Sequence, residues 1–198
     1  MINSFPQEDT QKKCHEIVHE TLGANYVNLS IGDFILHENG KGNKSQVKCK
    51  LIFSNDWENL HIKGAGAGVV DALFDSMLSF FCKDFFSLQQ VQFEDFSMEI
   101  KFKSFKVRPT DAPVEMKIAL INKWKKRIYF SAQSRSMMLA AIGAITKAFE
   151  YLINAETAFK QLQSDIKEAK SRNRVDLVNK YTHQAAELVS LISYEDVL

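Results

Sequence analysis

The chain has 198 residues, of which 45% are hydrophobic and 25% charged, and its formal net charge is +1. This composition excludes an intrinsically disordered chain and provides enough apolar residues for one good core or two small ones. A net charge so close to zero gives no overall field that would draw in nucleic acid or an anionic membrane surface. No apolar run reaches the roughly 18 residues that span a bilayer, so we expect a cytoplasmic protein that binds neither membrane nor nucleic acid. The cysteines Cys14, Cys49 and Cys82 show no CxxC spacing, which is typical of reduced thiols.

The predicted elements follow a repeated order along the chain. Residues 7–22 have helical apolar spacing and stop at Gly23, which indicates a helical lead-in over residues 1–25. Alternating apolar residues then predict strands over 26–38, 46–53 and 59–64, and a helix follows over 69–81. A second round gives strands over 96–107, 113–121 and 127–132 and a helix over 134–155.

This order predicts an α+β protein made of two β-β-β-α units related by pseudo-twofold symmetry. The units span residues 26–83 and 92–155 and repeat with an offset of roughly 70 residues. Neither unit can cover its sheet alone, so the two share a core within one domain, 26–155, or within a dimer of such pairs. Residues 156–198 form a charged helical tail, whose apolar stripe is expected to dock on its own domain or on a partner subunit. The stripe consists of Leu177, Tyr181, Leu188 and Leu191.

A glycine hinge, HIKGAGAGVVDALFDSML, joins the third strand to the first helix of the repeat. A P-loop is excluded because Val69 and Val70 stand where lysine and serine or threonine are required. A dinucleotide fingerprint is disfavoured because the spacing is GxGxG and the preceding strand is antiparallel. Two interpretations stay open: the helix N-terminus binds a small anion such as a carboxylate, or the glycines only permit a tight turn.

Two further motifs suggest other chemistry. His15, Glu16 and His19 form a formal HExxH, which on a helix could hold zinc, but no third ligand is recognisable, so a solvated amphipathic helix is favoured. The segments KFKSFKVR and KWKKR could bind nucleic acid through lysines and phenylalanines, but the alternation of the first is typical of an ordinary half-buried strand. No carboxylate pair, serine elbow or Cys–His arrangement indicates a catalytic site.

Four segments together resemble a known family: the hinge followed by VVDALFDSM, then FEDFSMEI, TDAPVEMKIAL and SRSMMLAAIGAITKAFEYLINA. They look like the regulatory, dimerising C-terminal domain of alpha-isopropylmalate synthases and the related citramalate synthases. The likeness covers residues 26–155. It implies two β-β-β-α units, a homodimer, and binding of an end-product amino acid, leucine or isoleucine, that inhibits a catalytic barrel.

The resemblance also implies an effector site, carried over position by position. The family's GNGPVDA-like hinge falls on GAGVVDA, so Gly66, Gly68 and Asp71 would lie beside the polar end of the effector. FEDF would place Phe93 and Phe96 at its side chain. Further pocket positions match Ile100 and Ala112. Val69 replaces a frequent proline, Phe96 lacks the hydroxyl of the family's tyrosine, and the second hinge reads SAQSRS, so the identity of the effector stays open.

The chain contains neither a catalytic barrel nor the His-x-His metal pair of the synthases. We therefore expect a stand-alone regulatory domain without cofactor or enzymatic activity, which acts on a separate catalytic synthase chain or on its own dimer. The alternatives are a dimerisation scaffold that has lost its ligand and a metalloenzyme built on the HExxH motif.

Overall fold

The computed structural model describes residues 6–39, 44–54, 60–100 and 112–192. It is an α+β fold with two three-stranded antiparallel sheets, each followed by a helix, which confirms the predicted class. Sheet A contains β1 (Leu29–Asn39), β2 (Lys44–Phe53) and β3 (Leu60–Gly66), and α2 (Val69–Phe81) follows it. Sheet B contains β4 (Gln92–Ile100), β5 (Val114–Ile121) and β6 (Arg127–Ser134), and α3 (Met137–Ser171) follows it.

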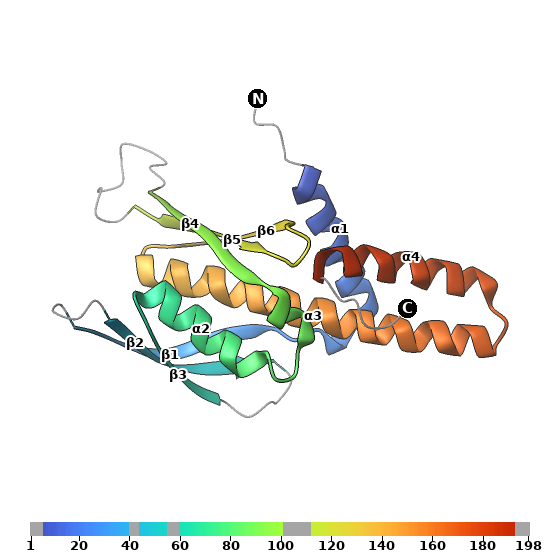
Figure 1. Cartoon of the computed structure of the whole chain (residues 1–198), viewed down its shortest axis with the longest axis horizontal. Coiled ribbons are helices and arrows are strands. Elements are labelled where there is room, and N and C mark those ends of the chain that lie inside the picture. Colours follow the sequence, from blue (N-terminus) through green and yellow to red (C-terminus); the bar gives the residue numbers. More distant parts are fainter. Residues whose placement is uncertain (1–5, 40–43, 55–59, 101–111, 193–198) are drawn as a thin grey trace.

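The two sheets enclose the helices in a layered arrangement. In Figure 1, α2 and α3 lie between sheet A and sheet B, so each sheet has one face toward the core and one toward solvent. The burial of β2 alternates accordingly, with Val47, Cys49 and Leu51 facing inward. On β5, Met116 and Ile118 face inward in the same way. One core therefore serves both units.

Helix α3 carries polar side chains that fix the segments leading into each sheet. The carboxylate of Glu150 accepts hydrogen bonds from the Tyr26 hydroxyl at 3.0 Å and from the Leu29 N–H at 2.8 Å. The Asn154 amide bonds both backbone groups of Val27. The fully buried Glu156 accepts from the N–H groups of η2 (Phe86–Gln90), which leads into β4. These side chains satisfy backbone groups that neither sheet ladder pairs.

The N-terminal and C-terminal helices pack on this core. Helix α1 (Pro6–Leu22) is followed by Gly23, whose φ of +50° is the left-handed conformation that glycine accepts most readily. Helix α4 (Val175–Ile192) packs along α3 and touches α1. Leu188 is fully buried, so part of the predicted stripe docks on its own domain; the Leu191 side chain lies outside the described residues.

Two expectations from the sequence differ most from the structure in extent. The first strand of the second unit begins at Gln92 rather than 96 and its predicted second half lies in 101–111, outside the described residues. Helix α3 does not stop near Ala155 but continues to Ser171.

By length and composition, α3 is also apolar enough to cross a bilayer, although no run of that kind was expected. In the fold, 67% of its most apolar window of 18 residues is buried, as in the core helix of a soluble protein. The structure is therefore compatible with a soluble protein.

Candidate functional site

The glycine hinge lies between the end of β3 and the start of α2. Gly66 is the last residue of β3, and a side chain there would collide with the Asp71 carboxylate and with the backbone nitrogen of Ala72, which would lie 2.6 Å from the new Cβ. Gly68 is the residue before α2, in an extended conformation, with nothing within 4 Å of the position of a Cβ. Packing explains the glycine at 66, whereas the space beside Gly68 is open.

The start of α2 has backbone donors and one acidic side chain. No side chain in the described part of the chain caps this helix, and its first intrahelical bond runs from the Ala72 N–H to the Gly68 carbonyl at 2.9 Å. The N–H groups before Ala72 have no partner within the helix, which suits an anion. The Asp71 carboxylate takes one nearby donor, the Ala67 N–H, at 2.8 Å. One turn further, burial and the charge of Asp71 raise the pKa of Asp75.

The equivalent hinge before α3 is satisfied by its own serines. The Ser136 hydroxyl accepts from the Leu139 N–H at 3.4 Å, and the Ser134 hydroxyl accepts from the Ser136 N–H at 3.2 Å. Ser136 is thus an ordinary N-cap. Of the two helices that follow a hinge, α3 has a side-chain cap, whereas α2 has none among the described residues.

The predicted apolar residues of the site lie along β4. Phe93 is half-buried, with its ring 5.1 Å from that of Phe74 on α2 and 6.2 Å from that of Phe96. Farther along the strand the side chains are uncovered: Phe96 is 50% exposed, Met98 45% and Ile100 53%. We call Phe96, Met98 and Ile100 the β4 row. Sequence analysis missed Met98, although its alternation with Phe96 and Ile100 could have identified it.

The predicted site residues fall into two groups. Gly66, Gly68 and Asp71 meet at the hinge, and Phe93 contacts Phe96 on β4. In Figure 1 the start of α2 and the end of β4 lie at the same end of the molecule. Among the described residues, no hydrogen bond or ring contact joins the two groups. Ala112 is buried, 6% exposed.

The histidine motif on α1 holds two imidazoles close together. The Nε2 atoms of His15 and His19 are 3.2 Å apart, within hydrogen-bond distance, and the ring of His19 stacks on Tyr26 at 4.2 Å. Burial and the neighbouring His19 lower the pKa of His15. Within the described part of the chain, no three His, Cys, Asp or Glu side chains gather to hold a metal ion. A catalytic zinc needs three protein ligands, and this motif supplies two imidazoles.

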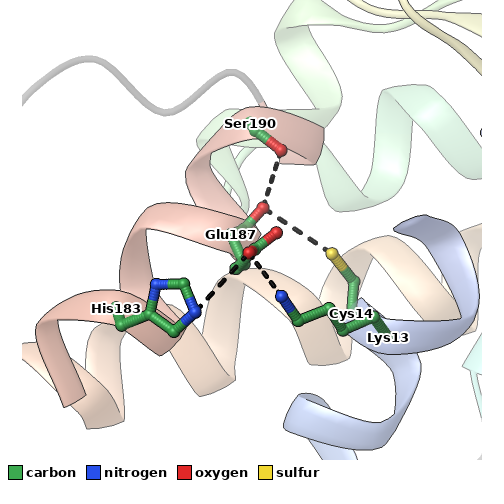
Figure 2. Close-up of polar contacts among 5 residues, drawn as sticks. All are labelled: Lys13, Cys14, His183, Glu187 and Ser190. Carbon is green, nitrogen blue, oxygen red and sulfur yellow. Dashed lines mark hydrogen bonds and ion pairs between the residues drawn. The ribbon is translucent and has the colours of Figure 1, made fainter. Parts of the chain in front are cut away.

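A second grouping, shown in Figure 2, superficially resembles a Cys–His–Glu triad between α1 and α4. The Cys14 thiol points at the backbone carbonyl of Glu187, 3.6 Å away, and not at His183. Cys14 is fully buried, and burial raises its pKa to about 11, which disfavours the reactive thiolate form. The Glu187 carboxylate instead accepts from Lys13 at 2.6 Å and lies 3.7 Å from His183. The grouping holds α4 against α1.

The structure describes only one of the two basic segments. The lysines of KFKSFKVR lie outside the described residues. In KWKKR, Arg127 makes a bidentate ion pair with Glu94 at 2.8 Å, and Lys125 takes a left-handed turn conformation with φ 62°.

Comparison with known proteins gives no assignment: the chain matches no protein-family model, and no curated protein matches it significantly.

Proposed function

We propose that this chain is a regulatory and dimerisation domain, without catalytic activity, that binds a branched-chain amino acid at the hinge before α2. The resemblance to the alpha-isopropylmalate synthase regulatory domain suggests leucine or isoleucine as the effector. The observation that carries the proposal is the uncapped start of α2 with Asp71 beside it, at the same end of the fold as the β4 row.

The hinge suits the two charges of a free amino acid. The carboxylate would accept hydrogen bonds from the first N–H groups of α2, where the helix dipole also favours negative charge. The ammonium would pair with the Asp71 carboxylate, which is exposed. A branched apolar side chain would then need an apolar surface, and the β4 row supplies one.

The β4 row also supports the dimer. Phe96, Met98 and Ile100 lie on the inward side of an edge strand but are about half exposed. Adjacent uncovered apolar side chains of this kind mark interaction surfaces. A second copy of the chain would cover them, and a ligand that favours one packing of the dimer would pass its signal to a separate catalytic synthase chain or to the dimer itself. We place this protein in the cytoplasm, where the free thiols of Cys14 and Cys49 stay reduced.

Calorimetric titration with leucine, isoleucine and valine tests the effector. We expect saturable binding of at least one of them to the wild type. The Gly68→Ala variant should keep the unfolding temperature but lose binding, because its methyl group occupies the open space beside the helix start. The absence of any binding or thermal shift with all three amino acids at millimolar concentration would contradict the effector proposal.

A dimerisation scaffold without ligand is the second candidate, because Asp71 already satisfies the hinge donor at Ala67. Sedimentation of the Met98→Lys variant tests the dimer: it should be monomeric. Val175→Lys, which changes an apolar residue 68% exposed on α4, serves as the matched control and should sediment like the wild type. A dimer that persists in Met98→Lys would place the interface elsewhere.

A further inference from the structure

A cavity of about 780 Å³ lies where α1, the edge strand β6 and α3 meet, and none of the hinge or β4-row residues lines it. We call it the α1 cavity. Its volume falls in the range of about 300 to 1,000 Å³ that small-molecule sites occupy. The side chains that carry the argument are Lys12, His15, Tyr26, Tyr129, Lys147 and Glu150.

Hydrogen bonds between the elements hold the walls of this cavity in place. The side-chain amide of Gln11 donates to the Tyr129 carbonyl at 2.8 Å and accepts from the Tyr129 N–H at 3.2 Å, as a neighbouring strand would. The Tyr151 hydroxyl on α3 donates to the Gln11 carbonyl at 3.2 Å. Helix α1 is thus tied to both β6 and α3. A site with fixed walls loses less entropy when a ligand binds.

The charges around the cavity favour an anion. Glu150 is the one carboxylate among the described residues of the wall, and both of its oxygens already accept hydrogen bonds, from the Tyr26 hydroxyl and from the Leu29 N–H. Lys147 donates one hydrogen bond, to the Ser131 carbonyl at 2.9 Å, and keeps two further N–H donors. Lys12 has no hydrogen bond or ion pair with any residue that the structure describes.

Two other basic side chains line the cavity but are less available to an anion. A third lysine, Lys117, is paired with Glu115 at 3.5 Å. Burial and His19 lower the pKa of His15, which disfavours its charged form. Two ammonium groups, Lys12 and Lys147, are therefore left to bind a ligand.

Aromatic side chains form much of the remaining lining. Tyr26, Tyr129, Phe130 and Tyr151 all line the cavity. Burial and the adjacent Glu150 raise the pKa of Tyr26, so its phenol stays protonated. Aromatic side chains of this kind present large apolar faces to a planar ligand.

We propose that the α1 cavity binds an aromatic carboxylate, with the carboxylate against Lys12 and Lys147 and the ring among the tyrosines. In this assignment His15 is a polar wall residue of a binding site and not a metal ligand. The site is independent of the hinge, and it gives α1, which lies outside the region of family resemblance, a role of its own.

Calorimetric titration of the full chain with 4-hydroxyphenylacetate tests the proposal, with 4-hydroxyphenylacetamide as the matched uncharged compound. We expect saturable binding of the acid and at least about tenfold weaker binding of the amide, the loss of one charge-assisted hydrogen bond. Lys12→Gln and Lys147→Gln should each weaken binding of the acid by about tenfold. Lys63→Gln, an exposed lysine on sheet A, is the control and should bind like the wild type.

Three outcomes would overturn the proposal: no saturable binding of the acid at millimolar concentration, equal binding of acid and amide, or unchanged binding in both cavity variants. Lys12 is exposed and has no hydrogen bond or ion pair with a described residue, so Lys12→Gln should fold and remain informative if Lys147→Gln unfolds. Saturating leucine should leave the affinity for the acid unchanged. Displacement of the acid by leucine would place the acid at the hinge and would also contradict the assignment. If leucine does not bind at all, the effector proposal fails but the proposal for the α1 cavity does not.

Discussion

Replacing Gly66 with alanine should loosen the packing of α2 on sheet A. The new Cβ would lie 2.6 Å from the backbone nitrogen of Ala72, and ordinary contact begins at 3.4 Å. The contact would therefore be about 0.8 Å too short, so the start of α2 must move away from β3 by about that distance. Rotation of a side chain cannot relieve this contact, because the atom that the new Cβ meets is a backbone atom of the helix itself.

The energetic cost follows from what this movement disturbs. Leu73 and Met77 of α2 are almost completely buried, and a gap of this size forfeits a quarter to a half of their contact energy on one side. Overpacking of this kind costs about 1 to 3 kcal/mol. The hydrogen bond from Ala67 to Asp71 is exposed and adds about 0.5 kcal/mol. We therefore expect a loss of about 2 to 3 kcal/mol, or about 5 to 10 °C in the unfolding temperature of a chain of this size.

Urea unfolding followed by circular dichroism measures this loss, and Gly68→Ala is the matched control. Alanine at 68 meets no atom within 4 Å, and the restricted unfolded chain offsets the weaker cap, so its stability should stay within about 0.5 kcal/mol of the wild type. If Gly66→Ala is as stable as the wild type, or if Gly68→Ala loses as much as Gly66→Ala, the close approach of α2 to β3 is refuted.

Three further predictions concern the helices that flank the sheets. The hydrogen bond from Lys13 lowers the pKa of Glu187 below 4.5, so the docking of α4 should be fully stable above pH 4.5 and weaken as the pH falls through the folded value. The free energy of unfolding, measured as a function of pH, should show this loss. The Glu187→Gln variant should depend less on pH in this range, and an unchanged pH dependence in that variant would contradict the prediction. Leu188→Ala should cost about 3 kcal/mol in urea unfolding, because the side chain is completely buried, and an unchanged midpoint would mean that α4 is not docked. In the native protein a thiol reagent should modify the half-buried Cys82 well before Cys14, whose burial raises its pKa to about 11, and equal rates would argue against this packing of α1.

The sequence correctly predicted those elements in which several local signals indicate the same structure. The helix expected over 69–81 is the observed α2, because the glycines mark its start and helical apolar spacing runs to its end. The alternation over 113–121 gives β5 nearly residue for residue. The repetition of three strands and a helix was sufficient to predict the fold class.

Other features depend on irregularity or on distant contacts. A register shift between Phe93 and Asp95 puts both Phe93 and Phe96 on the inward face of β4, which a strict alternation cannot anticipate. Helix α3 continues beyond Ala155 because the charged segment that follows contains no glycine or proline to end it. The α1 cavity joins α1 to residues more than 100 positions later, such as Tyr129, and no local pattern encodes that meeting.

The polar side chains of α3 also set the order in which the chain can fold. Val27 is bonded to Asn154, 127 positions later, and η2 is bonded to Glu156, about 70 positions later. During synthesis the first sheet therefore emerges long before the helix that ties down its beginning. A nascent chain that ends before α3 should stay open to proteases, and the native fold should form late and slowly, because these long loops must close before their contacts stabilise it.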